Sequence, residues 1–243
     1  MKIIGVIPAR YASTRFPGKP LVDIQGRSMV MRVYDQAMKG SLLAKVVVAT
    51  DHLEIFDHVL QSGGNAVMTR EFHQSGTERC AEVHDIMGDD MDAVINIQGD
   101  EPFIDPLQID SVARCLMQPH VRIATLVAPI KSLEDLDSPH VVKAVLDVNR
   151  RALLFSRLPI PYCRDAPSEM RLMHNTYYRH IGIYGYRADV LREIVRLPFS
   201  SLEKAESLEQ LRWMQNGYSI HAEFTDEPGV SIDTPEDLKK LSD

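Results

Sequence analysis

The sequence is poor in cysteine and has no long apolar run, and each absence argues against a class of protein. Its three cysteines, Cys80, Cys115 and Cys163, lie far apart and form no CxxC pair, which argues against a disulfide framework or a zinc ribbon. The apolar start, Ile3 to Ala9, is too short for a signal peptide, and no apolar run approaches the ~20 residues of a membrane span. We therefore expect a protein of the reducing cytoplasm that does not insert into membranes.

Basic residues are too few for a typical nucleic-acid-binding protein. The 243 residues include 27 Lys and Arg against 34 Asp and Glu, and the formal net charge is −7. Proteins that bind a phosphate backbone usually have a basic face and an alkaline pI. The nine histidines lack a metal spacing such as H-E-x-x-H, so zinc is not expected either. A small anion bound by a local basic loop is still compatible with this composition.

Short β-branched runs alternate with segments of helical periodicity along the chain. Met29, Val33 and Ala37, for example, fall on one face of a helix. This alternation predicts one α/β domain with a mostly parallel, helix-covered sheet. We expect a smaller inserted lobe at about 123–186, because residues 158–175 are rich in proline and have little periodicity. The predicted strands are 3–8, 45–50, 93–98, 123–129, 141–146 and 220–224.

Residues 202–215 form the predicted helix with the most clearly marked ends. Ser200 and Glu203 have the spacing of a capping box, in which each side chain accepts a hydrogen bond from the other residue's backbone N–H. Asn216 and Gly217 are a typical stop, because glycine readily adopts the left-handed conformation that ends many helices. We therefore predict one continuous helix over this range.

A group of basic residues follows the first predicted strand. The stretch IPARYASTRFPGKPL contains Arg10, Arg15 and Lys19. It is not a P-loop, because that motif needs glycine and then Ser or Thr where Ser13 and Pro20 stand. Loops at the carboxyl ends of strands in such sheets bind phosphates, and Arg and Lys side chains suit phosphate oxygens. The stretch therefore favours a phosphate-bearing ligand, with a solvated basic loop as the alternative.

Two aspartates that follow apolar runs are candidates for a metal site. Asp100 lies in QGDEP, and Asp233 lies in SIDTP near the carboxyl end of the chain. A magnesium ion that bridges phosphates takes one or two carboxylates and several waters. We expect the two side chains to meet at the carboxyl edge of the sheet. The alternatives are turn chemistry at Asp100 and an acid favoured by a helix N-terminus at Asp233.

Six stretches of the chain match, in order, the motifs of one enzyme family. They are IPARYASTRFPGKPL (7–21), HQSGTER (73–79), QGDEP (98–102), YRHIGIYGYR (178–187), LEQLR (208–212) and VSIDTPEDL (230–238). On these motifs the chain resembles the 3-deoxy-manno-octulosonate cytidylyltransferases, the CMP-Kdo synthetases, over nearly its whole length. The first motif is shared loosely with CMP-sialic acid synthetases, whereas the later ones are specific to the Kdo enzymes.

The resemblance implies a Rossmann-like nucleotidyltransferase sheet whose inserted lobe serves sugar binding and dimerisation. It implies transfer of CMP from CTP to the anomeric hydroxyl of 3-deoxy-D-manno-octulosonate (Kdo), with Mg²⁺ as cofactor and a homodimer as the assembly. Pyrophosphate leaves, and the CMP-Kdo serves lipopolysaccharide or capsule synthesis. The alternatives are a cytidylyltransferase for 8-amino-Kdo or sialic acid, a GT-A-like glycosyltransferase, whose usual D-x-D signature is not evident, and a non-catalytic nucleotide-binding module.

The matching motifs also imply roles for individual residues. The implied nucleotide-binding residues are Pro8, Arg10, Ser13, Arg15, Lys19, Ser75, Gly76, Thr77, Arg79 and Gln98. The implied sugar-binding residues are Gln98, Arg157, Arg164, His180, Tyr184, Glu209 and Gln210. Asp100 and Asp233 are the implied metal ligands, and these two are catalytic together with Arg10 and Lys19. Judged without the motif, His180 is more typical of a core histidine and Arg164 of an exposed loop.

Overall fold

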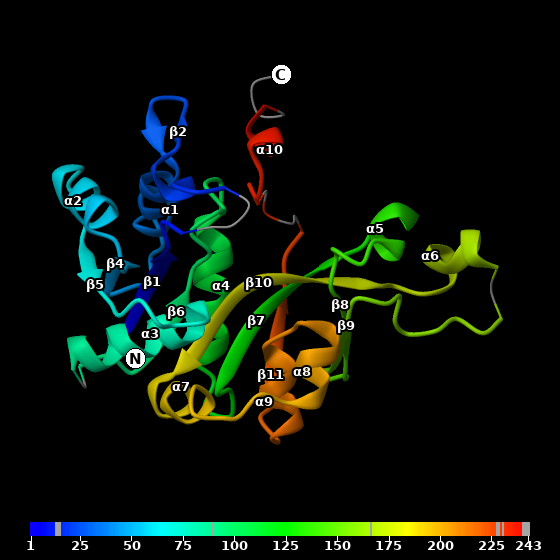
Figure 1. Cartoon of the computed structure of the whole chain (residues 1–243). Coiled ribbons are helices and arrows are strands. Elements are labelled where there is room, and N and C mark those ends of the chain that lie inside the picture. The colour runs from blue at the N-terminus through cyan, green and yellow to red at the C-terminus, as the bar shows by residue number, and fades with distance from the viewer. Residues whose placement is uncertain (13–15, 89, 166, 227–228, 230, 240–243) are drawn as a thin grey trace.

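A computed structural model of the chain describes residues 1–12, 16–88, 90–165, 167–226, 229 and 231–239 (Figure 1). The strands are β1 (Ile3–Ala9), β2 (Asp23–Ile24), β3 (Arg27–Ser28), β4 (Lys45–Thr50), β5 (Ala66–Met68), β6 (Ala93–Asn96), β7 (Ile123–Pro129), β8 (Lys143–Leu146), β9 (Ala152–Ser156), β10 (Tyr178–Arg187) and β11 (Ile220–Phe224). The α-helices are α1 (Met29–Ala37), α2 (Leu53–Gln61), α3 (Gly76–Met87), α4 (Pro106–Leu116), α5 (Leu133–Asp137), α6 (Arg171–His174), α7 (Ala188–Ile194), α8 (Ser201–Glu206), α9 (Gln210–Gln215) and α10 (Pro235–Lys239). None of these helices is long and apolar enough to cross a membrane.

A nine-stranded sheet forms the framework of the described chain. Its main path runs β11-β7-β10-β6-β1-β4-β5, and β8 and β9 extend it by pairing with β10 and with each other. The pairs β1–β4, β1–β6, β4–β5 and β7–β11 are parallel. Strand β10 runs antiparallel to both of its central neighbours, β6 and β7. The predicted mostly parallel α/β sheet is confirmed, with one antiparallel strand in its middle.

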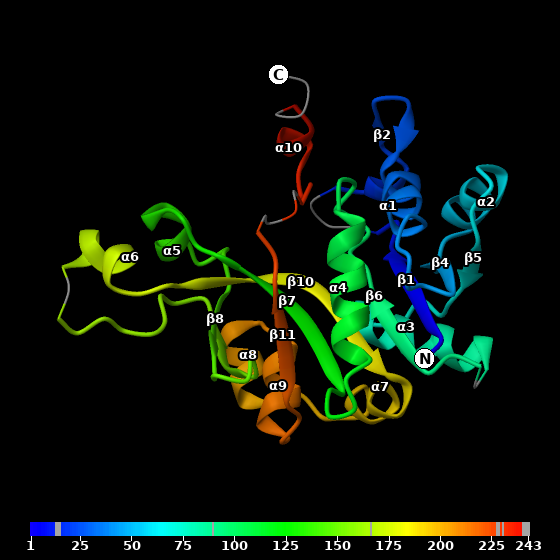
Figure 2. The ribbon, with the colours of Figure 1, turned by 180° about the vertical axis from the view of Figure 1, so that it is seen from behind.

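Both faces of the sheet are buried beneath helices. Alternate residues of β1 enter two different cores, because successive side chains of a strand point to opposite faces: Ile3 and Ile7 pack on one side, Ile4 and Val6 on the other. Helices α1, α2 and α4 supply the first core, and α3, α7 and α9 supply the second. Helices α3 and α7 lie in front of the sheet in Figure 1, whereas α4 lies in front in Figure 2.

The local predictions hold where the sequence pattern is strong. The strands predicted at 45–50, 123–129 and 220–224 are confirmed as β4, β7 and β11. The capping box is also present, since the Ser200 hydroxyl accepts from the Glu203 N–H and the Glu203 carboxylate accepts from the Ser200 N–H.

The prediction of one continuous helix over 202–215 is wrong. Helix α8 ends at Glu206, and α9 begins only at Gln210. Between them Ser207 adopts the left-handed conformation, with φ of 52°, and this breaks the helical hydrogen-bonding pattern. The break turns the start of α9 toward α3, because Glu209, at the end of the turn, contacts Thr77 in the first turn of α3.

An arm extends from the sheet between β7 and β10. We refer to residues 130–177 as the arm; it contains α5, β8, β9, the 3₁₀-helix η2 (Ser168–Met170) and α6. In Figures 1 and 2 it reaches away from the strands β1, β4 and β5. The range 123–186, expected to form an inserted lobe, therefore begins and ends in central strands of the sheet, and the arm lies between them.

Candidate functional site

A cleft of about 640 Å³ lies where the carboxyl ends of β1 and β6 meet. These two strands are parallel neighbours, so their ends open at the same edge of the sheet, where α/β proteins bind ligands. The amino end of α3, the middle of β10 and the start of α9 form the other walls. The lining residues are Pro8, Ala9, Arg10, Lys19, Pro20, Gln74, Ser75, Gly76, Thr77, Asn96, Gln98, Gly99, Asp100, Gly182, Tyr184, Tyr186, Glu209, Gln210 and Trp213.

Lys19 joins the two aspartates that the sequence singles out. Its Nζ lies 2.8 Å from Oδ2 of Asp100 and 3.5 Å from Oδ1 of Asp233. Lys19 opens the 3₁₀-helix η1 (Lys19–Leu21) after β1, Asp100 follows β6, and Asp233 precedes α10. The backbone N–H of Ile232 donates to the Asp100 carbonyl at 2.9 Å, which holds the carboxyl-terminal segment beside the end of β6. The expected meeting of Asp100 and Asp233 therefore occurs around an ammonium group.

Glu101 adds a third carboxyl group beneath this pair. Its side chain is buried, and its Oε2 has no hydrogen-bond partner among the described atoms. Burial, together with the negative charges of Asp100 and Asp233, raises the pKa of Glu101 to about 7. The acidic group at this end of the cleft is therefore strongly attractive to a cation, and Lys19 is the cation that the structure places against it.

Two glycines allow the walls of the cleft to approach each other. A Cβ on Gly99 would lie 2.6 Å from the backbone carbonyl oxygen of Pro8, so only glycine lets the end of β6 pack this closely on β1. A Cβ on Gly76 would lie 3.1 Å from Nδ2 of Asn96, which shows how closely the amino end of α3 sits against β6. Ser75 caps α3 by accepting from the Glu78 N–H at 3.2 Å. The free N–H groups of such a helix end suit an anion in the cleft.

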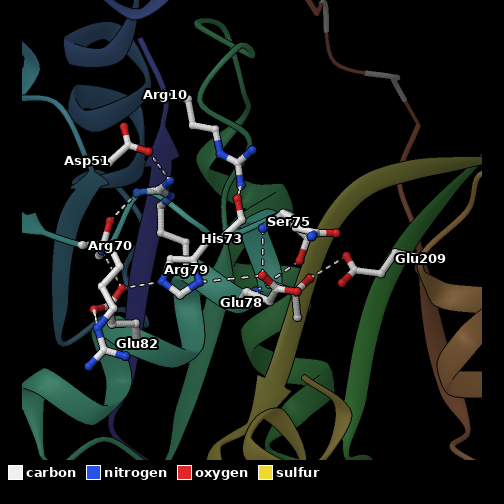
Figure 3. Close-up of polar contacts among 12 residues, drawn as sticks. Arg10, Asp51, Arg70, His73, Ser75, Glu78, Arg79, Glu82 and Glu209 are labelled. Carbon is white, nitrogen blue, oxygen red and sulfur yellow. Dashed lines mark hydrogen bonds and ion pairs between the residues drawn. The ribbon is translucent and has the colours of Figure 1, made fainter. Parts of the chain in front are cut away.

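Arg79 lies behind the cleft and does not line it. Its side chain is fully buried, and Nη2 donates to Oδ2 of Asp51 at 2.6 Å (Figure 3). Nη1 donates to the Thr69 hydroxyl. Burial and the nearby positive charge of Arg79 lower the pKa of Arg10, which lines the cleft and donates to the His73 carbonyl. The predicted contact of Arg79 with the nucleotide is therefore replaced by a contact that supports the wall.

Further contacts hold the segment that leads into α3. The Glu82 carboxylate accepts from the backbone N–H of Arg70 at 2.9 Å and also contacts the ring of His73 (Figure 3). Glu78 accepts from the backbone N–H of Gln74 at 2.8 Å. The motif HQSGTER thus supplies both the lining of the cleft and the acids that fix the backbone of that lining.

The wall on the β10 and α9 side is aromatic and amide-rich. Tyr184 packs edge to face with Trp213, their ring centres being 5.2 Å apart, and both line the cleft. Gln98 reaches across from the end of β6 and donates to the Gly182 carbonyl at 2.9 Å. Gln210 is buried at the start of α9 and completes this wall. A ligand with an apolar face and polar edges finds both packing surface and hydrogen-bonding groups here.

Three residues that the resemblance assigns to the sugar do not line the cleft. Burial among aromatic rings lowers the pKa of His180 to about 3, and its Nε2 lies 2.9 Å from the Thr125 hydroxyl. Arg157 donates to the carbonyl oxygens of Glu206, Ser207 and Pro139. Arg164 is exposed in the arm. His180 and Arg157 therefore support the structure around the cleft.

The structure brings most of the predicted residues into one place. Those that line the cleft are Pro8, Arg10, Lys19, Ser75, Gly76, Thr77, Gln98, Asp100, Tyr184, Glu209 and Gln210. Asp233 reaches it through Lys19, and Ser13 and Arg15 lie outside the described residues. The sequence analysis missed Asn96 and Trp213, although Asn96 lies in the apolar run before QGDEP and Trp213 follows Gln210 by one helical turn.

The cleft contains two candidate metal ligands rather than a full cage. Among the residues that the structure describes, no group of three or more His, Cys, Asp or Glu side chains has the arrangement of a metal site. Magnesium at phosphate-binding sites uses one or two carboxylates and takes its other ligands from phosphates and water. Asp100 and Asp233 with an ammonium between them fit that mode of binding.

Comparison with known proteins finds relatives that extend over nearly the whole chain. A cytidylyltransferase family model matches residues 4–221. The chain is 50% identical over 244 residues to a 3-deoxy-manno-octulosonate cytidylyltransferase of Parabacteroides distasonis, covering 99% of this chain and 96% of the relative. It is 51% identical over 245 residues to the protein of the same name from Bacteroides thetaiotaomicron, covering 98% and 96%. A solved CMP:2-keto-3-deoxy-manno-octonic acid synthetase complexed with CTP is 42% identical, with a TM-score of 0.92 and coverage of 99% and 97%.

Replacing Arg79 by Met should lower the free energy of unfolding by about 3 kcal/mol, because it leaves the largely buried carboxylate of Asp51 without its partner. Arg70 gives a matched control. Its side chain is 69% exposed and lies 3.5 Å from Glu82, so Arg70→Met should cost less than about 1 kcal/mol. Urea denaturation of the two variants measures this difference. Equal losses for both would show that the Arg79 contact does not support the wall.

Proposed function

The chain belongs to the 3-deoxy-manno-octulosonate cytidylyltransferase family, and we propose that its cleft transfers CMP from CTP to the anomeric hydroxyl of Kdo, with release of pyrophosphate. The observation that carries this proposal is the group formed by Lys19, Asp100 and Asp233 at the ends of β1 and β6. In this group the positive charge of Lys19 suits phosphates, and the carboxylates of Asp100 and Asp233 suit a cation bound to those phosphates. The names of the relatives, all of them Kdo cytidylyltransferases, do not favour 8-amino-Kdo or sialic acid as the substrate.

The reaction places negative charge on the α-phosphoryl oxygens and on the departing pyrophosphate. Arg10 and Lys19 line the cleft at the end of β1, and the amino end of α3 lies next to this strand, since Gly76 packs close to Pro8. These groups bind the triphosphate and stabilise the charge that develops during attack by the sugar hydroxyl. Ser13 and Arg15 belong to the same motif, and we propose that they bind the phosphates as well. We assign no side chain of the cleft as a general base.

Asp100 and Asp233 are the residues that hold Mg²⁺ in this proposal. The position of Lys19 supports a cation site at these two aspartates, because its ammonium group contacts both carboxylates. Bound Mg²⁺ supplies charge neutralisation for the phosphates and lowers the pKa of the attacking hydroxyl. Glu101 follows Asp100 and is buried, and it does not line the cleft. With Mg²⁺ held by Asp100 and Asp233, Lys19 would supply its charge to the nucleotide phosphates.

The sugar occupies the wall formed by β10 and α9. Gln98 lies between the two halves of the cleft, while Tyr184, Glu209 and Gln210 line the sugar half. His180 acts on this half through Tyr184, since their ring centres are 5.2 Å apart. Arg157 acts through the turn at Ser207, whose carbonyl oxygen it contacts. For Arg164 we propose a contact with the sugar carboxylate, because a guanidinium matches two carboxylate oxygens.

The arm is the proposed interface of a homodimer. It exposes a set of large apolar side chains. Large exposed patches of apolar side chains usually mark an interaction surface. The most exposed of them are Val148, Leu158, Tyr162 and Met173. We further propose that the enzyme acts in the cytoplasm, where CTP is available, and that CMP-Kdo enters lipopolysaccharide or capsule synthesis.

A pyrophosphate-release assay tests the proposed reaction. With CTP, Mg²⁺ and Kdo we expect turnover, and much slower turnover with ATP or GTP, because purines overfill a site built for a pyrimidine. Chelation of the metal should abolish turnover, and added Mg²⁺ should restore it. Faster turnover with 8-amino-Kdo or sialic acid would contradict the choice of sugar. Release of a nucleoside diphosphate, or CTP binding without any product, would contradict the reaction itself.

Light scattering tests the assembly. The wild-type protein should have twice the chain mass of 27.4 kDa. Leu158→Glu and Met173→Glu, combined in one variant, should shift it to the monomer, because each places a charge in an apolar interface. Met38→Glu is the control, since Met38 is 55% exposed at the end of α1 and lies outside the arm. A monomeric wild type, or a double variant that stays dimeric, would contradict an interface formed by the arm.

A further inference from the structure

Glu209 stands at the boundary between two cavities. It lines the main cleft and also an adjoining cavity of about 350 Å³, which shares Gln74 and Ser75 with the cleft. It belongs to the turn that separates α8 from α9, and its side chain is 27% exposed. A carboxylate in this position has to be held in one orientation if it is to face a sugar in the cleft rather than the adjoining cavity.

Each oxygen of the Glu209 carboxylate has a donor from the protein. The Thr77 hydroxyl donates to Oε2 at 2.8 Å, and Arg212 Nη2 donates to Oε1 at 3.1 Å. Arg212 is itself held by Glu203, whose Oε1 lies 3.1 Å from the same nitrogen. A carboxylate accepts more than one hydrogen bond per oxygen, so lone pairs of Glu209 remain available for hydroxyl groups of a ligand.

The Ser75 side chain also hydrogen-bonds to Glu209, but Thr77 is the more informative donor on the nucleotide side because its side chain is buried. It lies in the first turn of α3 and its side chain is buried, with 2% exposure. A threonine hydroxyl has one proton to donate, and the short contact commits that proton to Glu209. The other polar neighbour, the Tyr186 hydroxyl, is 3.4 Å away. The hydroxyl of Thr77 therefore holds Glu209, which lies at the start of α9 in the opposite wall of the cleft.

We propose that Thr77 is a positioning residue for the sugar half of the cleft, where it orients Glu209 from the first turn of α3. The inference rests on the proposed function, in which Glu209 contacts the sugar. It differs from the role that the family motif implies for Thr77, which is recognition of the nucleoside. The difference is measurable, because a positioning role predicts a defect toward the sugar and a nucleoside role predicts a defect toward CTP.

Thr77→Val tests this directly, since valine keeps the shape of threonine and removes the hydroxyl. We expect the KM for Kdo to rise roughly 10- to 100-fold, which corresponds to one lost hydrogen bond to a charged group. The KM for CTP should stay within about twofold of the wild-type value, because the nucleotide loses no contact. Thr77→Ser keeps the hydroxyl and should restore most of the affinity for Kdo.

A double-mutant cycle keeps the test decisive if the valine variant is less stable. Glu209→Ala alone should weaken Kdo binding, and adding Thr77→Val should weaken it little further, because Glu209→Ala has already removed the acceptor of the Thr77 hydroxyl. Calorimetric titration with Kdo measures binding independently of turnover. Additive effects, an unchanged KM for Kdo in Thr77→Val, or a raised KM for CTP alone would overturn the inference.

The two proposals fail in different ways. If the wild-type enzyme turns over another sugar acid instead of Kdo, the proposed substrate is wrong, and the same comparison of KM values is made with that sugar acid. If the wild type uses Kdo and Thr77→Val does too, with both KM values unchanged, the proposed function stands and the positioning role is wrong.

Discussion

The contact of Lys19 with Asp100 and Asp233 is the interaction on which the rest of the site depends. It joins three segments that lie 81 and 214 residues apart in sequence, and it does so at the edge where two buried parallel strands end. Without a cation, Asp100, Asp233 and the buried Glu101 would repel one another, since close charges of one sign interact strongly away from bulk water. The apolar strands therefore determine where the carboxylates lie, and a positive charge is needed to keep them together.

The other residues of the site are of two kinds. Some line the cleft and face the ligand, and others are buried behind them and hold them in position. Arg10 and Lys19 line the cleft, whereas Arg79, from the same set of predicted contacts, is buried against Asp51. Glu209 lines the cleft, and Thr77 orients it from α3. A buried polar side chain needs a partner, so these supporting contacts form wherever a motif places more polar groups than the ligand can use.

The sequence predicts the parts of this structure that depend on local pattern. The strands β4, β7 and β11 and the capping box at Ser200 follow from periodicity and spacing. The break at Ser207 does not, because a non-glycine residue in the left-handed conformation leaves no signal in the sequence. The burial of Arg79 is not predictable either. The motif HQSGTER indicates that a positive charge is needed at this position, but it does not show whether the guanidinium faces the cleft or the interior. Short strands such as β5 and β9 are formed by pairing with their neighbours, and such pairing depends on tertiary structure.

The proposed binding of a nucleotide-associated cation by Asp100 and Asp233 can be measured directly. Electron paramagnetic resonance of Mn²⁺, titrated into the protein with CTP, measures this binding without turnover. We expect Asp233→Asn to weaken Mn²⁺ binding in the CTP complex by at least about tenfold, because one charged ligand is lost. Asp226→Asn, at an exposed aspartate outside the cleft, should leave it unchanged. Equal Mn²⁺ affinity in Asp233→Asn and the wild type would contradict the account.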